Sequence, residues 1–105
     1  MSINNSIRAV PAPELIETMT GSNVLIGTLI APPVIIIFDN QGSVSVVISI
    51  DDVEWKTFTA GEALVLDMRG NHGIASNFSF DEGTQIFGNG ASGDFSVSYL
   101  YARDN

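Results

Sequence analysis

The stretch that decides the fold is "VSVVISIDDVEWKTFTAGEALVLDM", Val44 to Met68. Apolar residues recur in it with a period of two, which is the period of a half-buried β-strand. The alternation is interrupted at "DD" and at "TAGE", and both compositions favour turns. The stretch therefore predicts three strands joined by short turns, with the first two forming an antiparallel hairpin.

The same pattern continues along the rest of the chain, where β-branched and apolar runs alternate with turn residues. No segment shows sustained helical periodicity, and "ELIETMTG" (Glu14–Gly21) is compatible with either a helical turn or a strand. The strands that we expect are Val24–Ile30, Val34–Phe38, Val44–Ile50, Val53–Phe58, Ala63–Met68, Ile74–Phe80, Thr84–Phe87 and Phe95–Ala102. Short strands at this spacing predict an all-β fold, namely a single antiparallel β-sandwich or jelly-roll-like domain of about eight strands, or a small barrel.

The 105 residues correspond to one domain. Residues 1–13 differ from the rest because they contain "VPAP" and few large apolar side chains. We expect an extended N-terminal arm at 1–13, either frayed or ordered on a neighbouring subunit, and a β-sandwich domain at 14–105. The start, "MSINNSIRAV", lacks the pattern of a signal peptide, and the most apolar window is interrupted by Pro32 and Pro33. We therefore expect no membrane association.

The acidic composition of the chain argues against polyanionic binding partners. Twelve acidic and four basic residues give a formal net charge of −8, and the chain has no cysteine. The basic residues are scattered: Arg8, Lys56, Arg69 and Arg103. Because phosphate binding requires clustered Lys and Arg, we expect neither nucleic acid nor an anionic membrane surface as a partner. Without cysteine there is no disulfide and no thiolate zinc site.

The hairpin has two possible registers. With a two-residue loop at Asp51–Asp52, Ile48 would pair with Trp55 and Ile50 with Val53 on the inner face of the sheet. On the outer face, Ser49 would pair with Glu54 and Val47 with Lys56. A four-residue loop would instead pair Ile50 with Trp55. In either register Trp55 points inward, and the acidic residues lie at the tip and on the outer face.

Few residues offer catalytic chemistry. His72 is the single histidine and lies in "RGNHG", a loop by composition, with none of the common nucleophile, zinc or phosphate-loop motifs nearby. Paired carboxylates can hydrolyse glycosides, but one of them must lie in an apolar pocket. The candidates are Asp51, Asp52, Glu54, Asp67, Asp81, Glu82 and Asp94. Since they occur mostly in predicted turns, we expect a non-enzymatic protein without a cofactor.

Parts of the sequence could bind Ca²⁺ or sugars. The oxygen-rich loops "DNQG", "DD", "DEG" and "GNGASGD" could supply Ca²⁺ ligands, although none follows the EF-hand spacing. Trp55, Tyr99 and Tyr101 could stack on sugars, as in a carbohydrate-binding module of a phage tail or spike. However, "FSVSYLYA" places Phe95, Val97 and both tyrosines on one face, which favours core packing.

The same hairpin, with "GTQIF" and the closing "GDFSVSYLYA", resembles small β-sandwich virion proteins of tailed bacteriophages. The similar features are a hairpin around "SIDDV", the turn and strand "AGEALVLD", and a glycine-bounded last strand ending in "YLYA". They span residues 34–102, with one departure at Asp52, where a glycine is expected in the turn. The resemblance implies a structural role in the virion as a capsid decoration, minor capsid, head-fibre or neck protein. It implies the major capsid protein or other virion proteins as partners, and no catalytic residues.

A run of five apolar residues, "VIIIF" at 34–38, predicts a contact surface. Along a strand, Val34, Ile36 and Phe38 can fill the core, which leaves Ile35 and Ile37 on the outside. We therefore predict that Ile35 and Ile37 form an oligomer interface, with a trimer as the first expectation. In the alternative, the N-terminal segment folds back and covers them.

Overall fold

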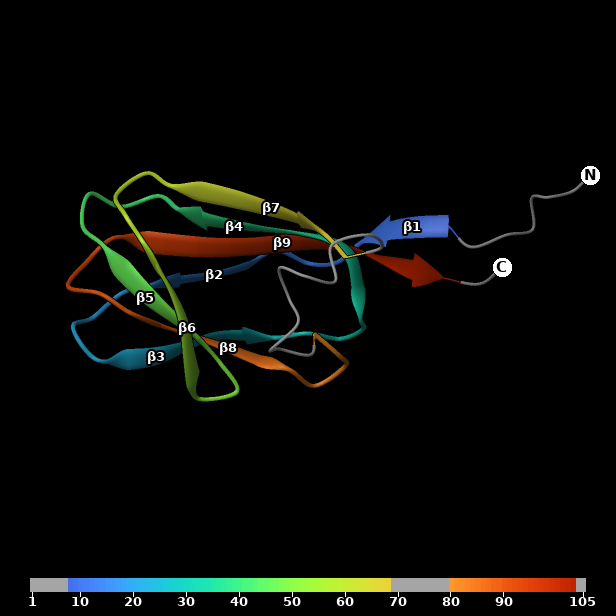
Figure 1. Ribbon diagram of the computed structural model, residues 1–105, viewed down its shortest axis with the longest axis horizontal. Coiled ribbons are helices and arrows are strands. Elements are labelled where there is room, and N and C mark those ends of the chain that lie inside the picture. Colours follow the sequence, from blue (N-terminus) through green and yellow to red (C-terminus); the bar gives the residue numbers. More distant parts are fainter. Residues whose placement is uncertain (1–7, 69–79, 104–105) are drawn as a thin grey trace, which may run out of the picture.

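The computed structural model describes residues 8–68 and 80–103, and within these ranges it contains nine strands (Figure 1). They are β1 (Arg8–Pro11), β2 (Leu15–Thr18), β3 (Asn23–Thr28), β4 (Pro33–Asn40), β5 (Val46–Ile50), β6 (Val53–Phe58), β7 (Ala63–Asp67), β8 (Gln85–Asn89) and β9 (Asp94–Arg103). Two antiparallel sheets pack as a sandwich, which confirms the predicted all-β sandwich.

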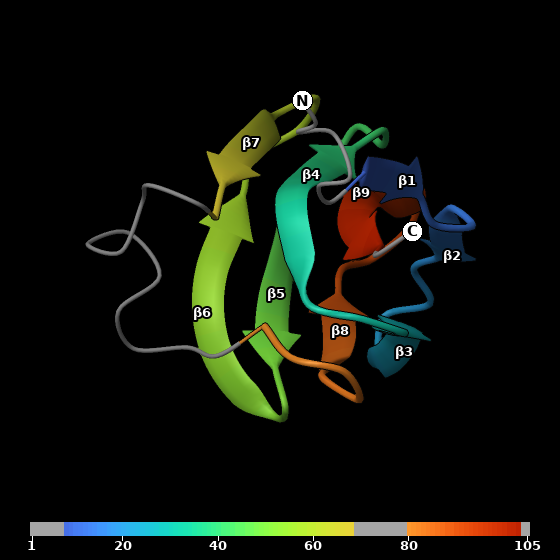
Figure 2. The same cartoon turned by 90° about the vertical axis from the view of Figure 1, so that its right-hand side faces the viewer.

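The five-stranded sheet has the order β1-β9-β4-β7, and β2 also pairs with β9. The ten-residue strand β9 is long enough to pair with β1 near its end and with β2 near its start, both on the edge opposite to β4. The four-stranded sheet has the order β3-β8-β5-β6. Viewed along the sandwich, β2 lies near β3 on one side, while β6 and β7 lie on the other (Figure 2).

The predicted strands agree with the described ones from β3 to β7 and at β8 and β9, within a few residues at each end. Glu14–Gly21, for which helix and strand were both open, contains strand β2. The predicted strand Ile74–Phe80 falls almost entirely outside the described residues, as do His72 and Arg69. Phe80, its last residue, is buried in the core without being part of a strand.

The end of the predicted N-terminal arm joins the five-stranded sheet. Arg8–Pro11 forms β1 and pairs with β9 of the same chain, and the Ala12 amide continues this pairing by donating to the Tyr99 carbonyl at 2.9 Å. These residues therefore have backbone partners within their own chain. Residues 1–7 lie outside the described part.

The core lies between the inner faces of the two sheets. Phe38 on β4 lies 5.1 Å from Trp55 and 5.9 Å from Phe58, measured between ring centroids, and Phe58 lies 5.2 Å from Phe95. Aliphatic side chains fill the space around the rings, and the fully buried ones include Ile36, Ile48, Ile86, Leu66 and Val97. Aromatic pairs at these distances add to the stabilisation from burial alone.

The β5–β6 hairpin has a two-residue tip, the first of the two registers that the sequence left open. Asp51 and Asp52 have φ values of 51° and 69°, as a type I′ turn requires. The pairs next to the tip, Ile50 with Val53 and Ser49 with Glu54, follow the two-residue register. The predicted pairs Ile48–Trp55 and Val47–Lys56 are wrong.

A β-bulge at Trp55 explains this difference. The register shifts between Ile48 and Ser49, so that Ile48 pairs with Lys56. The extra residue re-aims the bulged strand, and the Trp55 ring packs inward against Phe38, as predicted. Val53 was expected inside but is 58% exposed, because it lies at the tip beyond the core.

Candidate functional site

Strand β4 distributes its apolar run over both faces of the five-stranded sheet. Ile36 and Phe38 are completely buried, whereas Ile37 is 37% exposed and Ile35 is half-buried. Ile35 and Ile37 lie on the outer face, since neighbouring side chains along a strand point to opposite faces. This is the placement that the sequence alternation predicts for the two candidate interface residues.

The neighbouring strands add apolar residues to the same face. Ile37 pairs with Val65 of β7, and Ile35 pairs with Leu100 of β9, which in turn pairs with Pro11 of β1. Directly paired residues share a face of the sheet. Val65 is 59% exposed and Ile16 of β2 is 47% exposed. The same pairings place polar residues on this face, and Ser96, opposite Ile16, is only 3% exposed. The polar residues of the face are Asp39, Asp67, Ser96 and Ser98. We call this surface the outer apolar face: Pro11, Ile16, Ile35, Ile37, Val65 and Leu100.

A shallow groove of about 360 Å³ crosses the outer apolar face beside the N-terminal segment. It is lined by Pro11, Ala12, Glu14, Ile35, Ile37, Ser98, Tyr99 and Leu100. Residues 11–14 thus form one wall of the groove, as expected if the N-terminal segment folds back. They leave Ile37 more than one-third exposed, so this part of the segment borders the face rather than covering it.

Two of the candidate acidic residues, Asp51 and Asp94, accept hydrogen bonds that hold parts of the scaffold together. Asp51 Oδ1 accepts a hydrogen bond from the Gln85 amide at 2.8 Å, which ties the hairpin tip to β8. Asp94 Oδ1 accepts one from the Thr18 hydroxyl at 2.6 Å. Within residues 8–68 and 80–103, no three His, Cys, Asp or Glu side chains come close enough to hold a metal ion. Asp51 thus ties the hairpin tip to β8, and Asp94, at the start of β9, ties that strand to the end of β2.

The candidate aromatic residues belong to the core, as the sequence alternation predicts. Trp55 is half-buried and forms edge contacts with Phe58 and Phe80 in addition to its contact with Phe38. Tyr99 is 4% exposed, and its hydroxyl accepts a hydrogen bond from the Ile30 amide at 2.9 Å. Tyr101 is half-buried against the same core. Core packing therefore occupies the rings that a sugar platform would need.

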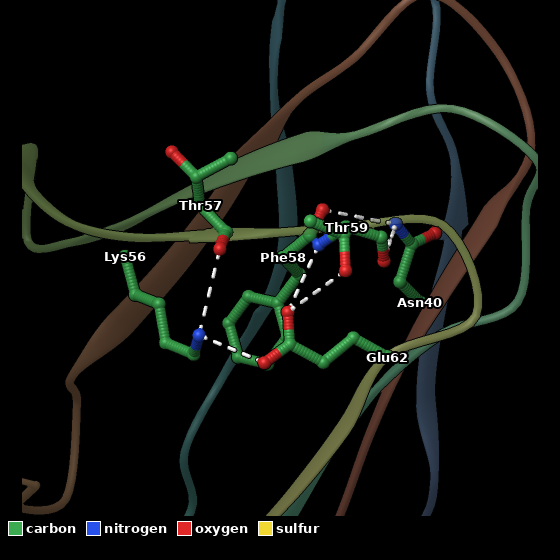
Figure 3. Close-up of polar contacts among 6 residues, drawn as sticks. All are labelled: Asn40, Lys56, Thr57, Phe58, Thr59 and Glu62. Atoms are coloured by element: carbon green, nitrogen blue, oxygen red, sulfur yellow. Dashed lines mark hydrogen bonds and ion pairs between the residues drawn. The ribbon is translucent and has the colours of Figure 1, made fainter.

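Sequence reasoning missed the role of the β6–β7 corner (Figure 3). Glu62 accepts hydrogen bonds from the Thr59 amide and from Lys56 Nζ, both at 2.9 Å. The Lys56 hydrogen bond, helped by that from Thr59, holds the pKa of the Glu62 carboxyl below its ordinary value. The Thr-x-x-Glu spacing in "TAGE" was the available signal, since the same spacing forms capping boxes at helix starts.

The buried side chain of Asn40 joins the two sheets at this corner. Its amide nitrogen lies 2.9, 3.2 and 2.9 Å from the carbonyl oxygens of Val44, Phe58 and Thr59, to which it donates. Its Oδ1 accepts a hydrogen bond from the Gly42 amide at 3.1 Å. Asn40 ends β4 of one sheet, and Phe58 ends β6 of the other, so one side chain fixes both strand ends.

Comparisons with protein-family models, with curated proteins and with solved structures found no match. In the described part of the chain, no helix has the length and apolar character needed to cross a membrane. The function must therefore be inferred from the residues and the geometry of the chain itself.

Proposed function

We propose that the chain is a non-enzymatic structural protein of a tailed-bacteriophage virion. In this proposal it decorates or stabilises the capsid, or its portal-proximal region, through the outer apolar face. The observation that carries the proposal is the exposure of Ile16, Ile37 and Val65, at 47%, 37% and 59%, on one face of one sheet. The similarity of residues 34–102 to small virion β-sandwich proteins supports the particle as the setting.

The outer apolar face is suited to binding other proteins. Neighbouring exposed apolar side chains, such as those of Ile37 and Val65, form the kind of surface that usually marks a contact with another protein. The major capsid protein, other virion proteins and further copies of this chain are the proposed partners. Each contact would be modest, but many copies on one particle multiply weak contacts through effective concentration. A net charge of −8 keeps unassembled copies soluble and apart.

The remaining candidate residues also fit a binding role. Asp51 fastens the hairpin tip, Asp94 joins β9 to β2, and Trp55 and Tyr99 pack in the core. Their side chains are thus engaged in holding the scaffold. This supports a protein that acts through its surface, and it favours the structural role over a sugar-binding one.

The test measures the chain on particles. Purified virions of the source should contain the chain at a fixed stoichiometry, and purified chain should bind particles that lack it. Ile37→Asp should reduce that binding at least tenfold, since it places a charge in the centre of the face. The matched control is Asn89→Asp, which adds the same charge at an exposed position of the other sheet.

Two results would contradict the proposal. One is that the Ile37→Asp and Asn89→Asp variants bind particles with equal affinity. The other is specific glycan binding by the isolated chain without any particle binding, which would favour the carbohydrate-binding alternative. Sedimentation of the purified chain tests the expected trimer, and Ile35→Asp should dissociate a trimer that forms through this face.

A further inference from the structure

Strand β7 is the end strand of the five-stranded sheet, and its backbone can be oriented residue by residue. The Asn40 amide donates to the Glu62 carbonyl at 2.9 Å, and the Met68 amide donates to the Val34 carbonyl at 2.8 Å. Because the direction of hydrogen bonding alternates along an antiparallel strand, Leu64 and Leu66 also face β4. The N–H and C=O groups of Ala63 and Val65 therefore point away from β4, along the edge of the sheet.

The other sheet edges of the described chain carry features that discourage pairing with another strand. Strand β6 has the bulge at Trp55 and carries Lys56, and β3 has a register shift between Leu25 and Gly27. Strands β1 and β2 share one edge, each is four residues long, and Pro11 lies in β1. Bulges, lysines, prolines and short strands are the usual protection of sheet edges.

Strand β7 has none of these features. Its register against β4 is unbroken over the five residues Ala63–Asp67, and Ala63, Leu64, Val65 and Leu66 are uncharged and contain no proline. Glu62, just before the strand, is paired with Lys56 at 2.9 Å. Asp67, the last residue of β7, is its one charged residue. A regular edge of this kind, with four uncharged residues in a row, is a template for another strand.

We propose that the β7 edge pairs with the β7 edge of a second copy of the chain. The second copy is the occupant that fits because antiparallel pairing of one edge with itself follows from a two-fold axis. With the axis beside Val65, Val65 lies opposite Val65 of the second copy and Ala63 lies opposite Asp67, so their outward backbone groups can bind one another. The two Asp67 side chains lie at opposite ends of the paired strands, so no charged residue faces another. The two five-stranded sheets become one continuous sheet.

This contact differs from the trimer expected at Ile35 and Ile37. It uses backbone groups at the edge of the sheet, whereas that interface uses side chains on its face. A two-fold contact by itself gives a dimer, and together with a trimer formed at the face it gives a hexamer, so the number of chains is even in both cases. The proposal concerns contact between copies of the chain and does not rest on a role in virions.

The first experiment blocks the edge in the full-length chain. Ala63→Pro removes an N–H that points away from β4, at the first residue of a strand, where proline is tolerated. It should weaken dimerisation in sedimentation equilibrium at least tenfold. The matched control Ala63→Ser keeps the N–H and should dimerise like the wild type, and far-UV circular dichroism checks that both variants fold.

The second experiment measures geometry without disturbing the edge. The chain has no cysteine, so single cysteines at Ile16 or Val65 can carry spin labels cleanly. Edge pairing places the two Val65 backbones one strand spacing apart, about 5 Å, and the two β2 strands seven spacings apart, about 34 Å. We expect strong dipolar broadening for labels at Val65 and a long distance for labels at Ile16 in the same assembly.

Three outcomes would overturn the proposal. One is a wild-type chain that remains monomeric at high micromolar concentration. Another is an assembly with an odd number of chains, or an assembly that still forms when the correctly folded Ala63→Pro variant replaces the wild type. The third is labels at Ile16 that approach each other as closely as those at Val65. None of these measurements involves particles, so each leaves the proposed virion role to its own test.

Discussion

Replacing Asn40 with aspartate tests how the two sheets are held together at the β6–β7 corner. The substitution keeps the size of the side chain and the oxygen that accepts from Gly42, but it removes the amide that donates to Val44, Phe58 and Thr59. A buried acceptor that loses its partner costs about 1–3 kcal/mol, and partly buried ones that water can reach cost about 0.5–1.5 kcal/mol each. For one buried and two partly buried carbonyls, Asn40→Asp should therefore reduce the free energy of unfolding by about 2–6 kcal/mol at pH 7.

The pH dependence identifies the cause. Burial and three facing carbonyl oxygens disfavour a carboxylate, so the pKa of the introduced aspartate is raised in the folded state. The destabilisation should therefore be largest at pH 7 and should shrink towards pH 4, where the protonated acid can donate to one carbonyl.

The assay is urea denaturation followed by the fluorescence of Trp55, the single tryptophan, at pH 7 and at pH 4. Asn89→Asp, the same change at an exposed position of β8, is the control and should stay within about 0.5 kcal/mol of the wild type. A loss below about 1 kcal/mol for Asn40→Asp at pH 7, or a loss that does not shrink at pH 4, would refute the reasoning.

Three further predictions concern the hairpin and its neighbouring corner. Trp55→Ala should destabilise the fold by about 3 kcal/mol, at the low end for a large aromatic because the ring is half-buried. Asp51→Asn should be nearly neutral because it keeps the oxygen that accepts from the Gln85 backbone amide. Urea denaturation followed by circular dichroism measures both variants, and equal losses of stability would contradict this prediction. Asp52→Gly should stabilise the fold by about 0.5–1 kcal/mol, since a φ of 69° suits glycine, and a lower thermal midpoint than the wild type would contradict this. The pKa of Glu62 is lowered from 4.5, so its stabilising contribution is present above that pH and is lost as the pH falls through the lower folded-state value. The difference in thermal midpoint between wild type and Glu62→Gln should accordingly vanish in acid, and a constant difference from pH 7 to pH 3 would count against the Lys56–Glu62 pairing.

The features that depend on local alternation were predictable from the sequence. A period of two placed Ile36 and Phe38 inside and Ile37 outside, and the same rule put Trp55 towards the core. The short "DD" separator placed Asp51 and Asp52 at the hairpin tip, although it left a two-residue and a four-residue loop both open and glycine was expected at Asp52. Such predictions succeed because in a strand the face of a residue follows from its position alone.

The features that depend on distant parts of the chain were not predictable. The bulge at Trp55 changes the pairing of Lys56 without any glycine or proline to mark it. Strand β1 contains few strand-forming residues and is a strand because the ten-residue β9 offers it an edge. Asn40 sits in "DNQG", which reads as a turn, and its role requires the end of β6, eighteen residues later, to lie beside it.

The outer apolar face and the β7 edge meet at Val65, and this makes the two proposed contacts interdependent. In one copy, Val65 lies at the rim of the face, next to Ile37. Pairing two β7 edges would bring both Val65 side chains to the middle of one continuous sheet, with an Ile37 on either side. A partner docked on that doubled face buries apolar surface of both copies, so docking and edge pairing must strengthen each other by linkage. Ala63→Pro leaves the six named residues of the outer apolar face unchanged and should therefore also weaken binding to particles. Ala63→Ser changes the same exposed position but keeps its N–H, and it should not weaken that binding.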